Sequence, residues 1–245
     1  MQLTKHKRDW DELAALDPYW AILSEPGKRF NLWDADEFFR TGEEQVDDLL
    51  ANARQLHRPN QWNRALDFGC GVGRLTRALS AYFSKAHGLD ISSEMVHKAR
   101  TLAPDCFFHV HTEPNLRLFP DSFFDLVYSV IVLQHQPTRA AVLGYIAEFV
   151  RVLRPEGLLA FQLPCQIPLR NRMQFGRRLY SLLRAIGAHS DFLYHRLHLV
   201  PIRMVAIPEK QIVAFIRDCG GHILDVRADT RAGAFLQSRT YYVSR

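Results

Sequence analysis

The chain lacks the features that mark several classes of protein. Its four cysteines, at positions 70, 106, 165 and 219, form no C-x-x-C pair, and we expect them to be reduced and mostly buried thiols. No apolar run approaches the ~20 residues needed to span a bilayer. The first 17 residues are charged and polar, without the hydrophobic segment of a secretory signal. These absences favour a cytoplasmic globular protein.

Acidic residues are missing from one long segment. Residues 157–190 contain five arginines and no aspartate or glutamate, and this segment alone accounts for the net charge of +5. A protein that coats nucleic acid would spread its positive charge more widely. The excess therefore points to one basic element, for which three interpretations stay open. The segment could be a helix face exposed to solvent, a binding site for an anionic ligand, or a helix that lies on an anionic membrane surface.

Residues 64–76 read R-A-L-D-F-G-C-G-V-G-R-L-T, a short apolar strand that contains Asp67, passes through three alternate glycines and opens into a helix. Glycine permits positive φ and lets a ligand approach the backbone. This pattern is typical of a nucleotide loop at the carboxyl end of a parallel strand. The spacing differs from the dinucleotide fingerprint G-x-G-x-x-G. Asp67 would repel a pyrophosphate but suits a ligand with an ammonium group, such as S-adenosylmethionine (SAM).

A second acid stands at the distance that a nucleoside site needs. Residues 86–92 read as a second strand that ends in Asp90. An acid about 20 residues after such a loop can accept hydrogen bonds from both ribose hydroxyls.

With these residues in place, the sequence resembles the class I SAM-dependent methyltransferases. Four segments between residues 64 and 163 carry the resemblance, in the family's order and spacing: L-D-F-G-C-G-V-G-R-L-T, G-L-D-I-S, F-F-D-L-V-Y-S-V-I-V-L-Q-H and R-V-L-R-P-E-G-L-L-A-F. The combination is specific for the family but says almost nothing about the methyl acceptor.

Alternating strands and helices predict an α/β fold with a doubly wound, mostly parallel sheet. We expect strands at 64–68, 86–90, 106–110, 123–129 and 157–163, with helices near 73–83, 93–102 and 138–152. Two last strands, near 222–228 and 238–244, follow a helix from 208 to about 219. They are joined directly, which suggests an antiparallel C-terminal hairpin and matches the seven-stranded sheet that the resemblance implies.

Two helical parts accompany this sheet. We expect residues 1–60 to form a helical N-terminal cap, with helices at 9–16, from 34 through 39 and from 41 or 42 to about 56, and a break at 17–20. Residues 61–245 then form the SAM-binding methyltransferase domain, with an inserted lid at about 164–207 that contains a helix over 169–186. Tyr19 and Trp20 are the expected pocket aromatics of the cap.

The resemblance implies a set of cofactor-binding residues. Asp67 would accept from the SAM ammonium, the glycine loop would wall the methionine portion, and Asp90 would hold the ribose. The adenine would lie between residues after the second strand and the Asn115–Leu116 pair, with Glu113 as an alternative to Asn115. The whole expected set is Asp67, Gly69, Cys70, Gly71, Gly73, Asp90, Ile91, Ser92, Asn115, Leu116 and Ser129.

A dedicated catalytic residue is optional for methyl transfer. The sulfonium is already activated, and alignment alone can supply ~7–11 kcal/mol. His135 is the candidate base because its ordinary pKa, near 6.5, suits proton removal at neutral pH, although a structural or positioning role is favoured. No metal is expected, because the paired histidines of the chain have no carboxylate at ligand spacing.

The predicted function is a SAM-dependent methyltransferase that yields S-adenosyl-L-homocysteine. It would methylate oxygen or nitrogen of a small-molecule, glycan or lipid-linked acceptor, anionic if the arginines bind it. Peripheral membrane contact through 169–186 is the other ligand-based interpretation of those arginines. The alternative function is a non-catalytic SAM-binding or scaffold protein of the same fold. Nucleic acid is disfavoured, because no asparagine-proline-proline-aromatic motif follows the fourth strand. The acceptor and the oligomeric state stay undetermined.

Overall fold

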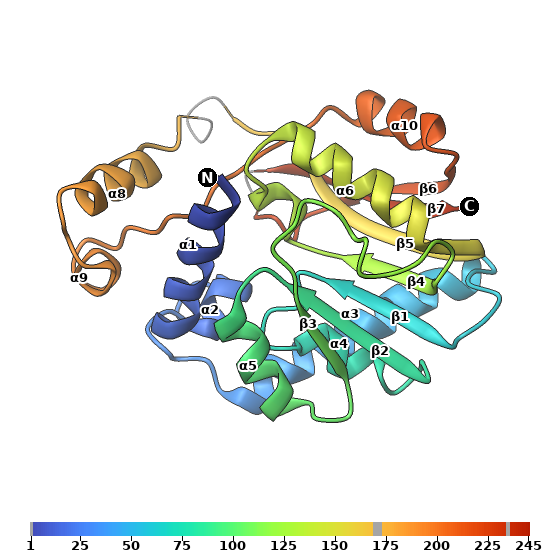
Figure 1. The fold of residues 1–245 in the computed structure, drawn as a ribbon, viewed down its shortest axis with the longest axis horizontal. Helices are drawn as coiled ribbons and strands as arrows, with labels where there is room; N and C mark the ends of the chain where they lie inside the picture. Colours follow the sequence, from blue (N-terminus) through green and yellow to red (C-terminus); the bar gives the residue numbers. More distant parts are fainter. Residues whose placement is uncertain (1, 169–172, 234–235) are drawn as a thin grey trace.

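A computed structural model describes residues 2–168, 173–233 and 236–245, which are built around one seven-stranded sheet (Figure 1). The strand order is β3-β2-β1-β4-β5-β7-β6. The strands are β1 (Arg64–Phe68), β2 (Lys85–Asp90), β3 (Phe107–Val110), β4 (Phe124–Ser129), β5 (Leu153–Gln166), β6 (His222–Asp229) and β7 (Gln237–Ser244).

The sheet confirms the predicted fold class. The first five strands run parallel, and β7 is antiparallel to both β5 and β6. The C-terminal strands thus form the expected antiparallel hairpin, whose second strand inserts between β5 and β6. All six residues of β4 are buried, since helices cover both faces of the sheet at its centre.

Helices flank the sheet in two layers (Figure 1). The layer of α3 (Ala35–Gln55), α4 (Arg74–Leu79) and α5 (Ser93–Leu102) packs on one face, where α3 and α4 share a core with β1 and β4. The layer of α6 (Arg139–Val152) and α10 (Glu209–Asp218) covers the other. The sheet is thereby buried except at its ends, and a short 3-10 turn, η1 (Leu133–His135), follows β4 at one of them.

The N-terminal cap is helical, with fewer breaks than the sequence predicts. A single helix, α3, replaces the two helices expected from 34 to 56, and Asp34 caps it by accepting from the backbone N–H of Glu37 (2.9 Å). Gly42 lies inside this helix, and a Cβ there would lie 2.6 Å from the carbonyl oxygen of Arg74. Glycine at this position lets α3 approach α4 closely.

The break expected at 17–20 is a single residue. Asp17 separates α1 (Gln2–Leu16) from α2 (Pro18–Ile22) and accepts from the backbone N–H of Trp20 (3.4 Å). Pro18 opens α2, where its missing N–H costs no intrahelical bond. The aromatic turn read from the sequence is therefore a capped helix start.

The insertion expected at 164–207 begins later, because β5 continues to Gln166 in its pairing with β7. It holds two helices, α8 (Phe175–Ala185) and α9 (Ser190–His195), which project away from the sheet beside α1 (Figure 1). The helix predicted from 169 is described from Phe175, and its expected start at 169–172 lies outside the described residues. Gly187, just after α8, has the positive φ of +95° that favours glycine after a helix end.

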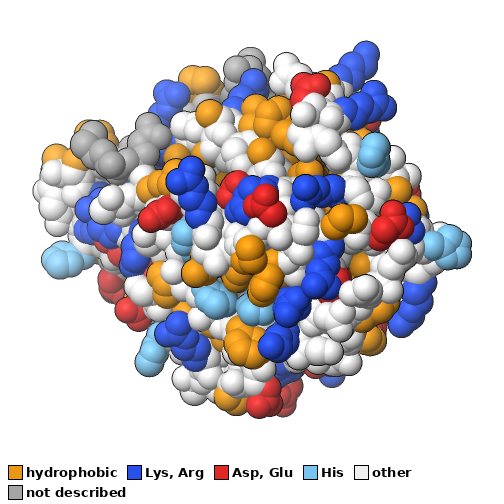
Figure 2. Space-filling model, turned by 45° about the vertical axis from the view of Figure 1, so that its right-hand side comes forward, with side chains coloured by type: hydrophobic (Ala, Val, Ile, Leu, Met, Phe, Trp, Pro, Cys, Tyr) orange, Lys and Arg blue, Asp and Glu red, His pale blue; other side chains and the backbone are white. Residues whose placement is uncertain are grey.

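The surface of the body is mixed in character. Figure 2 shows a face on which hydrophobic side chains form small groups separated by charged and polar ones. Within residues 2–168, 173–233 and 236–245, we find no helix whose length and apolarity would let it cross a membrane.

Candidate functional site

The glycine loop turns sharply at the carboxyl end of β1. The backbone N–H groups of Gly69 and Cys70 both donate to the carbonyl of Leu89 (2.7 and 3.1 Å), which fastens the loop to β2. Gly69 and Gly71 have φ values of +80° and +53°. A Cβ on Gly69 would lie 2.3 Å from Val132, and one on Gly71 would lie 2.4 Å from Ile22. The loop therefore exposes bare backbone where other elements approach it.

Asp90 is the polar centre of this edge. Its Oδ2 accepts from the N–H of Gly71 (2.9 Å) and its Oδ1 from the N–H of Ser92 (2.8 Å). Burial raises the pKa of Asp90, while these backbone hydrogen bonds oppose the rise. A carboxylate offers about four acceptor positions, so positions remain for two hydroxyl groups of a ligand.

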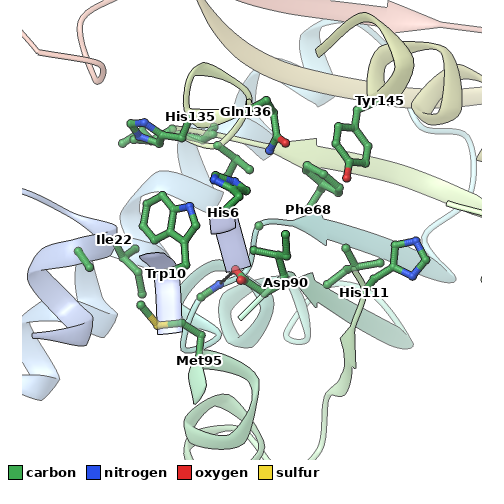
Figure 3. Close-up of a pocket in the computed structure, with 18 residues that line it drawn as sticks. His6, Trp10, Ile22, Phe68, Asp90, Met95, His111, His135, Gln136 and Tyr145 are labelled. Carbon is green, nitrogen blue, oxygen red and sulfur yellow. Dashed lines mark hydrogen bonds between the residues drawn. The ribbon is translucent and has the colours of Figure 1, made fainter. Parts of the chain in front are cut away.

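A cavity of about 710 Å³ opens beside Asp90 and the glycine loop (Figure 3). We call it the loop cavity. Phe68, Ile91 and Met95 give it apolar walls, and His6 and Trp10 reach into it from α1. Backbone, one carboxylate and apolar surface thus converge on one space.

The loop cavity fits the cofactor that the sequence resemblance implies. The remaining acceptor positions of Asp90 suit the two ribose hydroxyls of SAM. Ile91 and Met95 line the cavity beside Asp90 and offer apolar surface to an adenine ring. Gly69 and Gly71 line the same cavity, so their backbone would wall the methionine portion.

The structure brings five of the expected site residues to this cavity. Among its lining residues are Gly69, Gly71, Asp90, Ile91 and His135. Asp67 lies elsewhere, buried beside α4, where its Oδ2 accepts from the hydroxyl of Thr76 (2.7 Å). Its direct contact with the SAM ammonium stays a prediction.

The other expected residues support the loops around the cavity. Ser92 caps α5, and the hydroxyl of Ser129 donates to the carbonyl of Phe68 (3.2 Å), which ties β4 to β1. Gly73 has a φ of +87° at the start of α4. Cys70 is buried, and burial raises the pKa of its thiol well above the usual value, which favours its role as a small neutral residue.

The pair expected at the adenine edge does not line the loop cavity. The side chain of Asn115 bonds to Glu113 (3.1 Å) and to the backbone N–H of Arg117 (3.0 Å). Leu116 is fully buried. The imidazole of His111, four residues before Asn115, lines the cavity instead. Contact of Asn115, Leu116 or Glu113 with adenine stays a prediction.

His135 is buried and held in one orientation. Its Nδ1 donates to the carbonyl of Arg203 (2.6 Å), so its Nε2 is the acceptor nitrogen. Burial lowers the pKa of His135 to about 4, against the effect of that hydrogen bond. The imidazole is therefore neutral at pH 7 and a weak base, which favours a positioning role over proton removal.

Helix α1 supplies two lining residues that the sequence did not reveal. His6 and Trp10 lie one helical turn apart, and the ring of Trp10 is 5.6 Å from that of His135. Burial, together with His135 and Arg203, lowers the pKa of His6 to about 4. The i, i+4 spacing of these two ring side chains could have indicated that they share a helical face. It was missed because the helix was expected to begin at residue 9, after His6.

The anchor of α1 lies next to the Asp90 turn. Asp11 accepts from the hydroxyl of Ser92 (2.7 Å) and pairs with Lys7. Burial raises the pKa of Asp11, but hydrogen bonds from Lys7 and Ser92 outweigh it and hold the pKa below its usual value. This contact fixes α1 over the loop cavity as a roof.

A second cavity, of about 730 Å³, adjoins the first, and we call it the α1 cavity. The two share His6, Trp10 and His135 as lining residues, and the α1 cavity also has Lys5 and Arg203 in its wall. Tyr19 and Trp20, the aromatics expected in the pocket, line neither cavity. Tyr19 stacks on Phe38 at 4.4 Å and Trp20 packs on Tyr194 at 5.8 Å.

The burial of Asp67 predicts a pH dependence of folding. Burial raises the pKa of Asp67 from 3.8 to about 6, against the hydrogen bond from Thr76 and the charge of Arg74. A raised carboxyl pKa stabilises the fold when the group is protonated. The contribution of Asp67 is therefore lost as the pH rises from about 4 to about 6, by roughly 3 kcal/mol.

Urea denaturation over this pH range should show that Asp67→Asn lacks this loss. The difference between the unfolding free energy of the variant and that of the wild type should therefore shift in favour of the variant by roughly 3 kcal/mol between low and neutral pH. Thr76→Val should move the transition to higher pH, because it removes the hydroxyl that stabilises the carboxylate. Parallel curves for wild type and Asp67→Asn would contradict the assignment.

Comparisons with known proteins agree with this geometry. The family model of a methyltransferase domain matches residues 66–161. A trans-aconitate 2-methyltransferase of Methylobacterium nodulans is 35% identical over 137 residues, which cover 54% of this chain and 50% of that protein. A 2-methyl-6-phytyl-1,4-hydroquinone methyltransferase of Synechocystis is 36% identical over 155 residues, 61% of this chain and 47% of that one. The chain thus spans about half the length of the curated relatives it matches.

The fold has counterparts among solved structures. The magnesium protoporphyrin IX methyltransferase of Synechocystis with bound S-adenosylhomocysteine superposes with a TM-score of 0.64, at 20% identity over 100% of both chains. The structure of the same protein with bound SAM gives a TM-score of 0.62, at 19% identity over 100% of this chain and 97% of that one. Residues 66–161 thus match the family model of a methyltransferase domain, and the chain has the fold of the SAM-dependent methyltransferases.

Proposed function

We propose that this chain transfers a methyl group from SAM to oxygen or nitrogen of a small-molecule acceptor held in the α1 cavity. The observation that carries the proposal is the wall common to the two cavities. His6, Trp10 and His135 each line both of them. A methyl group leaving the loop cavity at this wall would enter the α1 cavity directly.

The residues around the cavities would align the two reactants and exclude water. Bound SAM supplies an electrophilic methyl group on a positively charged sulfur. Asp90 holds the ribose, and the backbone at Gly69 and Gly71 walls the methionine portion. Trp10 covers the junction with apolar surface. Alignment of this kind can supply ~7–11 kcal/mol, so no strong base is needed.

An acceptor O–H or N–H loses its proton when the methyl–oxygen or methyl–nitrogen bond forms and the methyl–sulfur bond breaks, whereas a carboxylate oxygen has no proton to lose. His6 lies at the junction and is neutral at pH 7, because burial, together with His135 and Arg203, lowers its pKa to about 4. A neutral imidazole can accept a hydrogen bond from the acceptor's O–H or N–H and orient its lone pair. The proton itself passes to solvent.

The charges of the α1 cavity favour an anionic acceptor. Lys5 and Arg203 line it with one acid, Asp9. Arg177 of α8 is near enough for the charges of Arg203 and Asp9 to affect its pKa, which burial lowers. Cations therefore outnumber acids around this space. One relative is named for trans-aconitate, a carboxylate, which supports the same class of acceptor.

The ribose assignment predicts that Asp90→Asn weakens SAM binding. Hydrogen bonds to a charged group contribute about 1.5–3 kcal/mol, so affinity should fall by about 10- to 100-fold in titration calorimetry. Glu94→Gln, on the exposed carboxylate of the second residue of α5, serves as the matched control and should leave affinity unchanged. Equal affinities of wild type and Asp90→Asn would refute the assignment.

The acceptor assignment predicts a separate effect of Arg203→Gln. Release of S-adenosylhomocysteine would be measured with a panel of small carboxylates, followed by kinetics on the best acceptor. The variant should raise KM for that acceptor by about 10- to 100-fold. Its affinity for SAM should stay unchanged, because Arg203 lines only the α1 cavity. Lys210→Gln, on the exposed side of α10, is the control; a KM shift equal to that of Arg203→Gln would contradict the proposal.

A further inference from the structure

Helix α8 presents apolar side chains to solvent. Phe175, Leu179, Leu182 and Ile186 follow one another at spacings of four, three and four residues, which places them on one helical face. Their exposed fractions are 65%, 47%, 61% and 74%. We call these four residues the α8 stripe.

The opposite face of α8 is polar and packs on the protein. Tyr180 is buried, and its hydroxyl donates to Glu12 of α1 (2.9 Å). Arg184, one turn later, forms an ion pair with the same carboxylate. A surface helix ordinarily buries its apolar face and exposes its polar one. In α8 the polar face is buried and the apolar face is exposed, so no other described part of the protein covers the stripe.

Exposed apolar side chains are concentrated around this helix. Among the described residues, 13 large hydrophobic side chains are exposed, and seven of them lie between Met173 and Leu197. Besides the stripe, these are Met173 before α8, with Phe192 in α9 and Leu197 just after it. The remaining six are distributed over the rest of the chain, as is usual for single surface residues.

The charge around the stripe identifies the chemistry of the partner. Residues 157–190 contain no acid, and Asp191 is the one acid between 173 and 198. Arg178 is exposed beside Leu179, and Arg196 is exposed beside Leu197. We propose that the α8 stripe docks on the surface of an anionic phospholipid bilayer, with Arg178 and Arg196 at the level of the headgroups.

Two features favour a bilayer over a second copy of this chain. Pairing of two stripes would bring Arg178 of each copy close together, with no acid of α8 to compensate. The stripe is also one helix wide and lies on an element that projects from the body (Figure 1). A narrow basic helix of this shape suits insertion at the boundary between headgroups and acyl chains.

The test is co-sedimentation of the full chain with vesicles of phosphatidylcholine, alone or mixed with phosphatidylglycerol. The wild type should bind the mixed vesicles, and added salt should weaken that binding. The double variant Leu179→Ser/Leu182→Ser should lower the partition coefficient by about tenfold or more. Arg178→Gln should weaken binding to mixed vesicles severalfold.

Leu32→Ser is the matched control, because Leu32 is 62% exposed and Leu182 is 61% exposed, but Leu32 lies between α2 and α3 rather than in α8. It should bind vesicles as the wild type does. All variants should keep wild-type affinity for SAM, which separates loss of docking from loss of folding or of the proposed function. Sedimentation equilibrium without vesicles completes the set and should give a monomer.

Three results would overturn the proposal. The first is a wild type that binds neither kind of vesicle, or binds both kinds equally. The second is a double variant that binds like Leu32→Ser. The third is a wild type that self-associates and a double variant that is monomeric, since the stripe would then be an interface between copies of the chain.

Discussion

The Asp90 carboxylate is the interaction on which the site depends. It ends β2, yet its two oxygens accept from backbone N–H groups on either side, that of Gly71 in the glycine loop and that of Ser92 at the start of α5. One side chain thereby fixes the relative positions of two strand ends and a helix start. The loop cavity forms at this junction, which is the usual place for a ligand in a sheet of this topology.

The roof of the site depends on the same turn. Asp11 reaches from α1 to the Ser92 hydroxyl, so the residue that caps α5 also anchors the N-terminal helix. Once α1 is held there, His6 and Trp10 stand between the loop cavity and the α1 cavity. The cavities proposed for the cofactor and the acceptor therefore share residues of a helix that belongs to neither the sheet nor its flanking layers.

The insertion adds a different kind of constraint. Its polar contacts to Glu12 orient α8 so that the stripe faces outward. Because α8 packs on α1, and α1 carries Lys5 and His6 in the wall of the α1 cavity, the helix that bears the stripe lies next to the helix that lines the cavity proposed for the acceptor. The stripe itself is on the far face of α8. Of the arginines that stood out in the sequence, Arg178 is exposed beside the stripe, and Arg184 pairs with Glu12.

The sequence by itself determined the sheet, the glycine loop and the position of Asp90, because local patterns encode them. Alternating apolar strands, glycines at positions of positive φ and an acid at a strand end are all short-range features. It did not determine that α3 runs unbroken through Gly42. The glycine looked like a helix break, and only the structure shows that it lies where α4 packs closely on α3. It also could not reveal His6, Trp10 or the α1 cavity, which arise where α1 meets η1 and the segment around Arg203. Contacts between segments so distant in the chain leave no local pattern, and only the tertiary structure decided them.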